Sequence, residues 1–388
     1  MILHPIPYGK QTITAEDIKA VTDALTSQFI TQGPKIDEFE NDFAKYIGVK
    51  YAVAVSNGTA ALHLAALALN VKPGSKVITT SITFAASANC VLYAGGEIFF
   101  VDIDPETFTI DIKKVRQLLD SHPKGTFSGI IPVDLAGYPV NTEEFRKLAD
   151  EYNLWILEDA CHAPGGYFID SKGKKIKCGD GQYCDAAIFS FHPVKHIATG
   201  EGGMITTNSK EIYDRLIMLR THGITKNPDL LIENHGSWYY EMQELGYNYR
   251  LTDIQAALGI SQLKRADAGL IRRREIAEKY DRIFANNPNI ITPKIIDGKN
   301  TSHAYHLYIV RVNNRIGLYD FLRNLQIYVQ VHYIPVHIMP YYKNLGWKNG
   351  DLPIAENYYE HCMSLPIFPA LTDEEQDFVI EKILEFYQ

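Results

Sequence analysis

The 388-residue chain has little cysteine and no long hydrophobic run, and each shortage excludes a class of protein. Its five cysteines are Cys90, Cys161, Cys178, Cys184 and Cys362. They are scattered and odd in number, which argues against a disulfide framework and favours a reduced compartment. No apolar run approaches the ~18 residues of a membrane-spanning helix, and the opening Met1-Ile-Leu-His-Pro5 does not have the pattern of a signal peptide. We therefore expect a cytoplasmic protein without a membrane partner.

Positive charge is not in excess either. The formal net charge is -8, so there is no electrostatic reason to expect nucleic acid as a partner. A pattern of metal ligands is also missing, because Cys178, Cys184 and His162 lack the paired short spacings of a zinc site. We expect no bound metal and interpret these cysteines as loop and core residues. With 46% hydrophobic residues, the chain can bury a large core, which favours two domains.

Short apolar runs alternate with helical patterns through the first two thirds of the chain. The predicted strands are residues 51–55, 77–80, 98–101, 129–133, 154–157, 186–191 and 204–207. The predicted helices between and around them include residues 36–46, 59–70, 112–119, 142–152 and 209–220, and another that Phe84 opens. This alternation predicts a mostly parallel sheet with helices on both faces.

The last third has a different pattern. A long charged helix is predicted over residues 265–287, followed by a strand over residues 304–311 whose side chains alternate between two faces. A second strand is predicted over residues 329–337, interrupted by a proline, and an amphipathic helix ends the chain. Residues 224–240 are polar and irregular, which predicts a surface loop near a subunit contact. At the other end, Thr14 is expected to cap a helix that follows an arm.

Lys195 stands in the most informative stretch of the sequence. Pro193 cannot continue a sheet ladder, so Lys195 follows a strand end, where open α/β sheets place their chemistry. Gly200, Gly202 and Gly203 are expected to take tight, positive-φ geometry before the next strand. Most lysines are solvated surface charges, but burial at such a turn lowers the pKa of the amine and makes it a nucleophile for Schiff-base formation.

Two other strand ends carry a chemical signal. Residues 56–59, Ser-Asn-Gly-Thr, lead from a strand directly into an alanine-rich helix, and free N–H groups at a helix start can bind an anion. An ordinary capped helix explains the same residues. Asp159 ends a buried strand, where a carboxylate is costly unless it meets a positive partner. The sequence therefore offers an anion cradle, a carboxylate and an amine in one sheet.

The stretch Ser190-Phe-His-Pro-Val-Lys195, followed by Thr199-Gly-Glu-Gly-Gly203, closely resembles the lysine motif of the DegT/DnrJ/EryC1/StrS family of nucleotide-sugar aminotransferases. The stretch Gly246-Tyr-Asn-Tyr-Arg250 resembles a second motif of that family, and the resemblance covers nearly the whole chain. It implies a pyridoxal 5′-phosphate (PLP) enzyme with the α/β aspartate-aminotransferase fold, fold type I. An N-terminal arm and a large domain with a mixed, mostly parallel sheet would occupy residues 1–264, and a smaller α+β domain residues 265–388.

The resemblance also implies roles for individual residues. Lys195 would attach PLP and move the reacting proton, Asp159 would pair with the pyridine nitrogen, and His162 would lie near a cofactor oxygen. The implied cofactor contacts are Gly58, Thr59, Phe84, Asp159, His162, Ser190, Lys195 and, from the neighbouring subunit of a homodimer with shared active sites, Asn248. The implied substrate contacts are Tyr8, Arg250, His332, Tyr333 and His337.

Plainer interpretations of several of these residues stay open. Phe84 can be a core residue, His162 a packing histidine, and Arg250 the partner of a local carboxylate. The aromatic residues around residue 335 can simply close the small-domain core. Glu158, beside Asp159, is not expected to touch the cofactor.

The implied reaction moves an amino group from L-glutamate to C4 of a UDP-linked 2-acetamido-2,6-dideoxy-4-hexulose, giving a UDP-4-amino-4,6-dideoxy sugar and 2-oxoglutarate. The motifs look most like the family branch that makes pseudaminic acid precursors. GDP- or dTDP-linked keto sugars and a non-catalytic regulator on the same fold are the alternatives. Sugar dehydratases of the family carry histidine at the lysine position, so Lys195 argues against that branch. No Gly-x-Gly-x-x-Gly follows the first strand to support a dinucleotide oxidoreductase.

Overall fold

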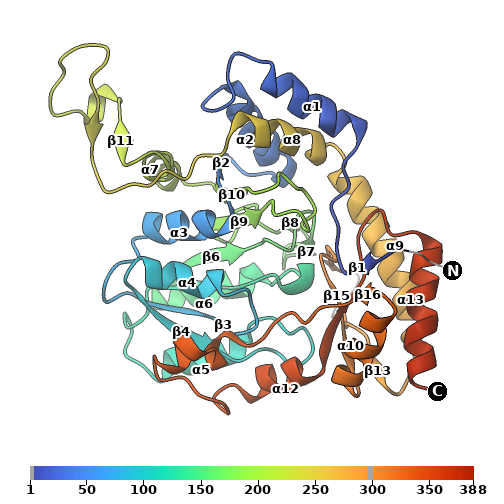
Figure 1. Ribbon diagram of the computed structural model, residues 1–388. Coiled ribbons are helices and arrows are strands. Elements are labelled where there is room, and N and C mark those ends of the chain that lie inside the picture. Colours follow the sequence, from blue (N-terminus) through green and yellow to red (C-terminus); the bar gives the residue numbers. More distant parts are fainter. Residues whose placement is uncertain (1–3, 296–299) are drawn as a thin grey trace.

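A seven-stranded sheet lies at the centre of the computed structural model, which describes residues 4–295 and 300–388 (Figure 1). The strand order is β2-β10-β9-β6-β5-β3-β4, and β10 runs antiparallel to both of its neighbours while the other pairs are parallel. The strands are β2 (Tyr51–Val55), β3 (Lys76–Thr80), β4 (Glu97–Val101), β5 (Gly129–Ile131), β6 (Trp155–Asp159), β9 (Ala186–Ser190) and β10 (Gly203–Thr207). The predicted mixed, mostly parallel sheet is therefore confirmed.

Helices cover both faces of this sheet, because alternate residues of its strands are apolar on both sides. In β9, Ile188 packs with α3, while Phe189 packs with Phe39 and Phe43 of α2. The helices of this part are α2 (Pro34–Ile47), α3 (Gly58–Ala68), α4 (Ala86–Tyr93), α5 (Ile112–Asp120), α6 (Thr142–Tyr152), α7 (Lys210–Arg220) and α8 (Asp253–Leu263). A small sheet of order β14-β7-β8 flanks them, with β7 (Tyr167–Ile169), β8 (Lys175–Lys177) and β14 (Thr301–Ser302).

The C-terminal part packs its own core around a three-stranded sheet of order β13-β15-β17. Its strands are β13 (Ile290–Ile291), β15 (Tyr308–Val312) and β17 (Cys362–Leu365), and its helices are α9 (Ala266–Phe284), α10 (Arg315–Asn324), α11 (Pro340–Lys343), α12 (Pro353–His361) and α13 (Asp373–Phe386). The predicted start of a new unit at residue 265 falls between α8 and α9, and this domain boundary stays a prediction. None of the helices in the described ranges is both long and apolar enough to cross a membrane.

Two predicted strands of this part were wrong in extent. β15 begins only at Tyr308, but its side chains alternate between two faces as predicted, because Ile309 packs into the core of the large sheet and Val310 into the C-terminal core. The predicted strand over residues 329–337 was wrong, because the strand of this region, β16 (Ile327–Tyr328), ends before it and only one bridge, from Gln330 to Ser364, lies within it. The chain then leaves the sheet, since Pro335 has no N–H to donate, and residues Val336–Ile338 form a 3₁₀ turn.

The N-terminal arm reaches across to the C-terminal part. β1 (Ile6–Pro7) pairs in parallel with β16, and Ile6 is buried in the C-terminal core. The arm then leads into α1 (Ala15–Leu25), whose predicted cap is confirmed: Thr14 and Asp17 form a reciprocal capping box. This crossing sets Tyr8 against the segment that follows β16, where its ring lies 5.1 Å from that of His332.

The predicted loop over residues 224–240 lies within a projecting ribbon (Figure 1). It contains β11 (Ile224–Thr225), which pairs antiparallel with β12 (Glu241–Met242). Ile232 and Trp238 are 87% and 71% exposed. Apolar side chains this exposed are consistent with the predicted subunit contact nearby.

Candidate active site

A cavity of about 710 Å³ opens beyond the carboxyl ends of the parallel strands. The segments that follow β2, β3, β5, β6 and β9 all contribute to its wall, as expected for an open α/β sheet. It brings together most of the predicted site residues, namely Tyr8, Gly58, Thr59, Phe84, Asp159, His162, Ser190, Lys195, His332 and Tyr333. The predicted site residues that do not line it are Asn248, Arg250 and His337.

The N-terminus of α3 forms one end of the cavity. Asn57 caps the helix by accepting from the Ala60 N–H at 2.8 Å, while Gly58 and Thr59 line the cavity. Gly58 leaves room for Ser190, because a Cβ at this position would lie 3.0 Å from the Ser190 Cβ. Backbone N–H groups and the helix dipole therefore meet at a small-residue turn that suits a phosphate.

The glycines after Lys195 act differently from the prediction. Only Gly200 has a positive φ, of 79°, whereas Gly202 and Gly203 do not. Gly203 is needed for close approach instead, since a Cβ there would lie 2.5 Å from the Asn57 carbonyl oxygen and 3.0 Å from the Gly58 nitrogen. The start of β10 therefore packs against the backbone of Asn57 and Gly58. We call the turn formed by Asn57, Gly58 and Thr59 at the start of this helix the α3 cradle.

Asp159 presents a fixed carboxylate at the end of β6. It is buried, with 5% of its surface exposed, and it lines the cavity. The Ser87 hydroxyl donates to Oδ2 at 2.6 Å, and the Cys161 N–H donates to Oδ1 at 3.2 Å. These two donors fix the orientation of the carboxylate but supply no countercharge, so the site suits a protonated ring nitrogen as its partner.

Lys195 follows β9 on the wall of the same cavity. Its Nζ lies 3.3 Å from Nε2 of His306. Burial lowers the pKa of the Lys195 amine below its ordinary value, against the opposing influence of Cys161 and Asp159. A lowered pKa leaves more of the amine unprotonated and therefore nucleophilic.

His162 and Tyr333 form a hydrogen-bonded pair next to Asp159. The Ala136 N–H donates to Nδ1 of His162 at 3.2 Å, and Nε2 lies 3.2 Å from the Tyr333 hydroxyl. Burial, followed by the charge of Lys195, holds the pKa of His162 well below its usual range. His162 is therefore neutral near pH 7, with its Nε2 proton available to Tyr333 or to a bound group.

Three further predicted contacts, two for the substrate and one for the cofactor, lie in different surroundings. His332 faces the cavity, lies 2.7 Å through Nδ1 from the Ser364 hydroxyl, and has its pKa lowered by burial to about 3. His337 is fully buried and contacts Glu356 at 3.0 Å, so it belongs to the packing around α12. Asn248 is exposed and lies next to Tyr249, which does line the cavity.

Sequence reasoning missed Ser87 and His306. The sequence predicts only a helix around Ser87 and only a strand around His306. A buried carboxylate needs donors, so Asp159 predicts a residue such as Ser87, but the sequence does not show where it comes from. Both residues reach the cavity through contacts between distant parts of the chain.

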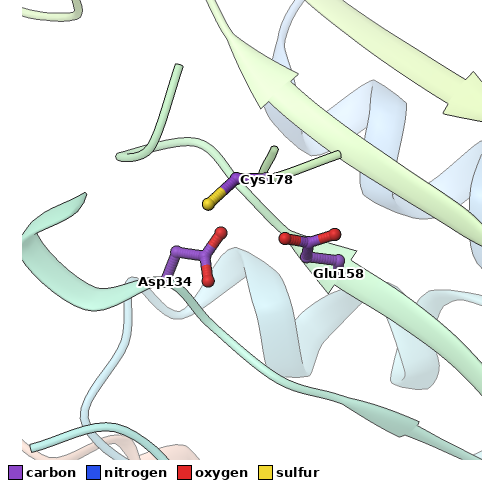
Figure 2. Close-up of side chains that lie close together, drawn as sticks. All are labelled: Asp134, Glu158 and Cys178. Carbon is purple, nitrogen blue, oxygen red and sulfur yellow. The ribbon is translucent and has the colours of Figure 1, made fainter. Parts of the chain in front are cut away.

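Glu158 points away from the cavity, towards Asp134 and Cys178 (Figure 2). The Gly179 N–H donates to Glu158 at 3.0 Å, and the Val140 N–H donates to Asp134 at 2.9 Å. Burial and the neighbouring carboxylate raise the pKa of Glu158 well above its usual value, and burial raises that of Asp134 to about 7. The two carboxyls are therefore best described as sharing one proton, which removes the cost of burying two adjacent charges.

The shared proton makes stability depend on pH. Above the unfolded carboxyl pKa of ~4, the folded state binds more protons than the unfolded state, so stability falls as pH rises, by up to ~1.4 kcal/mol per pH unit for each proton. Glu158→Gln keeps the shape and hydrogen bonds but holds no titrating proton. We expect its melting temperature, relative to the wild type, to rise between pH 5 and pH 8. The exposed Glu374→Gln is the control, and parallel pH profiles for all three proteins would contradict the shared proton.

The α3 cradle, the Asp159 carboxylate and the Lys195 amine, arranged around one cavity of this sheet, define a fold type I PLP enzyme. The model of the DegT/DnrJ/EryC1/StrS aminotransferase family matches residues 11–384. The chain therefore belongs to this family and is a PLP-dependent nucleotide-sugar aminotransferase.

Individual relatives match over almost their whole length. A UDP-4-amino-4,6-dideoxy-N-acetyl-beta-L-altrosamine transaminase of Campylobacter jejuni is 39% identical over 390 residues, which cover 99% of this chain and 98% of the relative. The GDP-perosamine synthase of Escherichia coli O157:H7 is 35% identical over 386 residues, 98% of each chain. Among solved structures, Helicobacter pylori PseC, an aminotransferase involved in the biosynthesis of pseudoaminic acid, superposes with a TM-score of 0.87 at 30% identity over 99% of both chains.

Proposed function

We propose that this enzyme transfers the amino group of L-glutamate to C4 of a UDP-linked 2-acetamido-2,6-dideoxy-4-hexulose. The observation that carries this proposal is the end-to-end similarity to the Campylobacter transaminase, whose name specifies a UDP-linked 4-amino-4,6-dideoxy sugar. The similarity to PseC supports the same branch. A GDP-linked sugar is the second candidate, because the GDP-perosamine synthase is only slightly less similar.

Each part of the cavity then has a task. When bound, PLP supplies an electron sink for the carbon that loses its proton. The N-terminus of α3, with Gly58 and Thr59, would hold its phosphate, and Phe84 would cover its ring. Asp159 would keep the ring nitrogen protonated, because its fixed carboxylate favours a positive partner. His162 would lie beside the ring oxygen.

Lys195 carries out the proton movement in this proposal. Its Nζ would hold the cofactor at rest and, once free, would accept the proton from the carbon that bears the nitrogen and donate it again in the same reaction. Burial suits the residue to both tasks. Because the pKa of the Lys195 amine is lowered, a larger fraction of it is unprotonated near neutral pH than is the case for an exposed lysine.

A nucleotide sugar that bears a diphosphate also needs cationic groups, and one chain supplies few. Within the described part of the chain, Lys195 is the one lysine or arginine among the lining residues of the cavity. Asn248 is exposed on a segment beside it, which suits a contact with a second copy of the chain. We therefore include a homodimer with shared active sites in the proposal, with Asn248 acting across the interface.

Mixing two inactive variants tests the shared site. Lys195→Ala and Asn248→Ala chains, unfolded together and refolded, should regain about a quarter of wild-type activity if the heterodimer makes up half of the dimers and has one intact site. Each variant refolded alone should stay inactive. The measurement is amino transfer per total chain, with sedimentation to establish the dimer. Activity in a monomeric fraction would contradict the shared site.

The substrate assignment has its own experiment. Purified enzyme is supplied with L-glutamate and, separately, with UDP-, GDP- and dTDP-linked 4-keto-6-deoxy sugars. We expect kcat/KM for the UDP sugar to exceed the others at least ~10-fold, a difference of ~1.4 kcal/mol in transition-state binding. Product analysis by NMR should show nitrogen at C4. A preference for the GDP sugar would replace the UDP assignment and leave the aminotransferase intact.

A further inference from the structure

His306 is the residue that lies closest to the Lys195 amine among the described contacts, yet no role has been assigned to it. Its Nε2 lies 3.3 Å from Lys195 Nζ, it is 4% exposed, and it lines the cavity. The two residues come from different parts of the fold, since Lys195 follows β9 of the large sheet and His306 lies two residues before the start of β15 in the C-terminal sheet. The contact therefore closes the cavity wall between them.

The surroundings of His306 keep its ring neutral. The ring of His162 lies 4.4 Å away and that of His196 lies 5.8 Å away, both measured between centroids. Lys195 faces Nε2 of His306, and the Arg273 guanidinium donates to the backbone carbonyl of His306. Burial, then the charge of Lys195 and the other neighbours, holds the pKa of His306 well below its usual range. A protonated amine has no lone pair, so a neutral His306 that faces it accepts at Nε2 and carries its own proton on Nδ1, an atom without a hydrogen-bond partner among the described residues.

The backbone that carries His306 is held in place by Arg273. This side chain of α9 is 1% exposed and donates to the carbonyl oxygens of Tyr305, His306 and Ile367, at 3.2, 3.3 and 2.9 Å. Tyr305 has a φ of 50°, and its N–H donates to Nδ1 of His303 at 2.8 Å. The His306 ring is therefore presented to Lys195 by a firmly bonded segment.

We propose that His306 is a positioning residue. Its Nε2 accepts a hydrogen bond from Lys195 Nζ whenever this amine is not attached to the cofactor. The inference rests on the proposed role of Lys195. Without such an acceptor, the released amine would sample several rotamers of a long side chain and would often lie away from the carbon that it serves. His306 does not take the proton itself, because its affinity for a proton is far below that of the amine. The half-reaction with the amino acid and the half-reaction with the keto sugar would then both start with Lys195 Nζ in the same position.

Two substitutions of similar polarity separate positioning from packing. In His306→Gln the longer side chain can place an amide oxygen near the position of Nε2, whereas in His306→Asn the amide ends near the position of Nδ1 and cannot reach Lys195. In cofactor-free protein, competitive labelling with acetic anhydride over a pH series, read by mass spectrometry, gives the pKa of the Lys195 amine. An acceptor stabilises the charged ammonium more than the neutral amine. We therefore expect a lower Lys195 pKa in the Asn variant and a value close to wild type in the Gln variant.

Steady-state kinetics supply the second readout. We expect kcat to fall about 10- to 100-fold in the Asn variant with little change in KM, and the Gln variant to recover most of the loss. The deuterium isotope effect with α-deuterated L-glutamate should increase in the Asn variant, because proton transfer becomes slower than the other steps.

Equal Lys195 pKa values and equal kcat values in the two variants would overturn the inference. Thermal melting monitors folding, and if the Asn variant does not fold, His306→Leu replaces it as the variant without an acceptor. The labelling experiment does not depend on turnover, so its failure is distinguishable from failure of the proposed function, which would appear as retained activity in Lys195→Ala.

Discussion

Replacing Lys195 by alanine should reduce amino transfer by on the order of 10⁴-fold or more. In the proposed mechanism the variant loses the general acid and base, which alone contributes ~10²–10⁴-fold, and also the amine that attaches the cofactor. The α3 cradle and Asp159 are unchanged, so the variant should still bind PLP through its phosphate and ring nitrogen. The measurement is kcat/KM, together with the amount of PLP retained after gel filtration.

Chemical labelling makes the same assignment without a substitution. Borohydride reduction of the PLP-loaded wild type should place the label on the peptide that contains Lys195. Lys210→Ala, which removes an exposed lysine on α7, is the matched control and should keep full activity and full labelling. A label on any other lysine, or turnover by the Lys195→Ala variant, would show that the chemistry lies elsewhere.

Replacing Asp159 by asparagine should have the second largest effect. The side chain keeps its size, but its amide group now faces two donors, the Ser87 hydroxyl and the Cys161 N–H, and the negative charge is gone. Removing one partner of a buried ion pair costs ~3–5 kcal/mol, which corresponds to a loss of about 10²- to 5 × 10³-fold in kcat if the pairing strengthens in the transition state.

Comparison with Ser87→Ala separates the charge from its orientation. This variant keeps the carboxylate and removes one donor, so we expect a loss of roughly 10-fold. The visible absorption of the bound cofactor should shift with pH in Asp159→Asn, because the ring nitrogen loses the group that keeps it protonated. Activity of Asp159→Asn equal to that of Ser87→Ala would contradict a charge role for Asp159.

The sequence predicts best what depends on neighbours in the chain. Each parallel strand that ends in a small residue, a carboxylate or a lysine places that side chain at the same edge of the sheet, so Gly58, Asp159 and Lys195 could be brought together without coordinates. Ser87 and His306 could not, because their contacts with Asp159 and Lys195 span 72 and 111 residues. Such contacts depend on how helices and units pack, which periodicity does not encode.

The wrong predictions for residues 329–337 and for Gly203 also result from contacts between distant parts of the chain. Residues 329–337 have a strand-like composition, but the chain leaves the sheet at this point and contacts the segment that follows β3, where the Val336 N–H donates to the Ser81 carbonyl at 2.9 Å. Gly203 suggested a turn, although its small size is required by a neighbouring backbone some 145 positions earlier in the sequence. Tertiary packing overrides local propensity at both places.

The pairing of β1 with β16 has a consequence for synthesis of the protein. Ile6 finds its partner only when Ile327 has been made, and the cavity wall that contains Tyr8 and His332 closes at the same moment. At translation rates of ~5–20 residues per second, the arm waits about 15–60 s for that partner. The large sheet can form in this interval, but a ribosome-bound chain that stops before residue 327 has an open cavity. Truncated products of this gene would thus be sheet-forming but inactive.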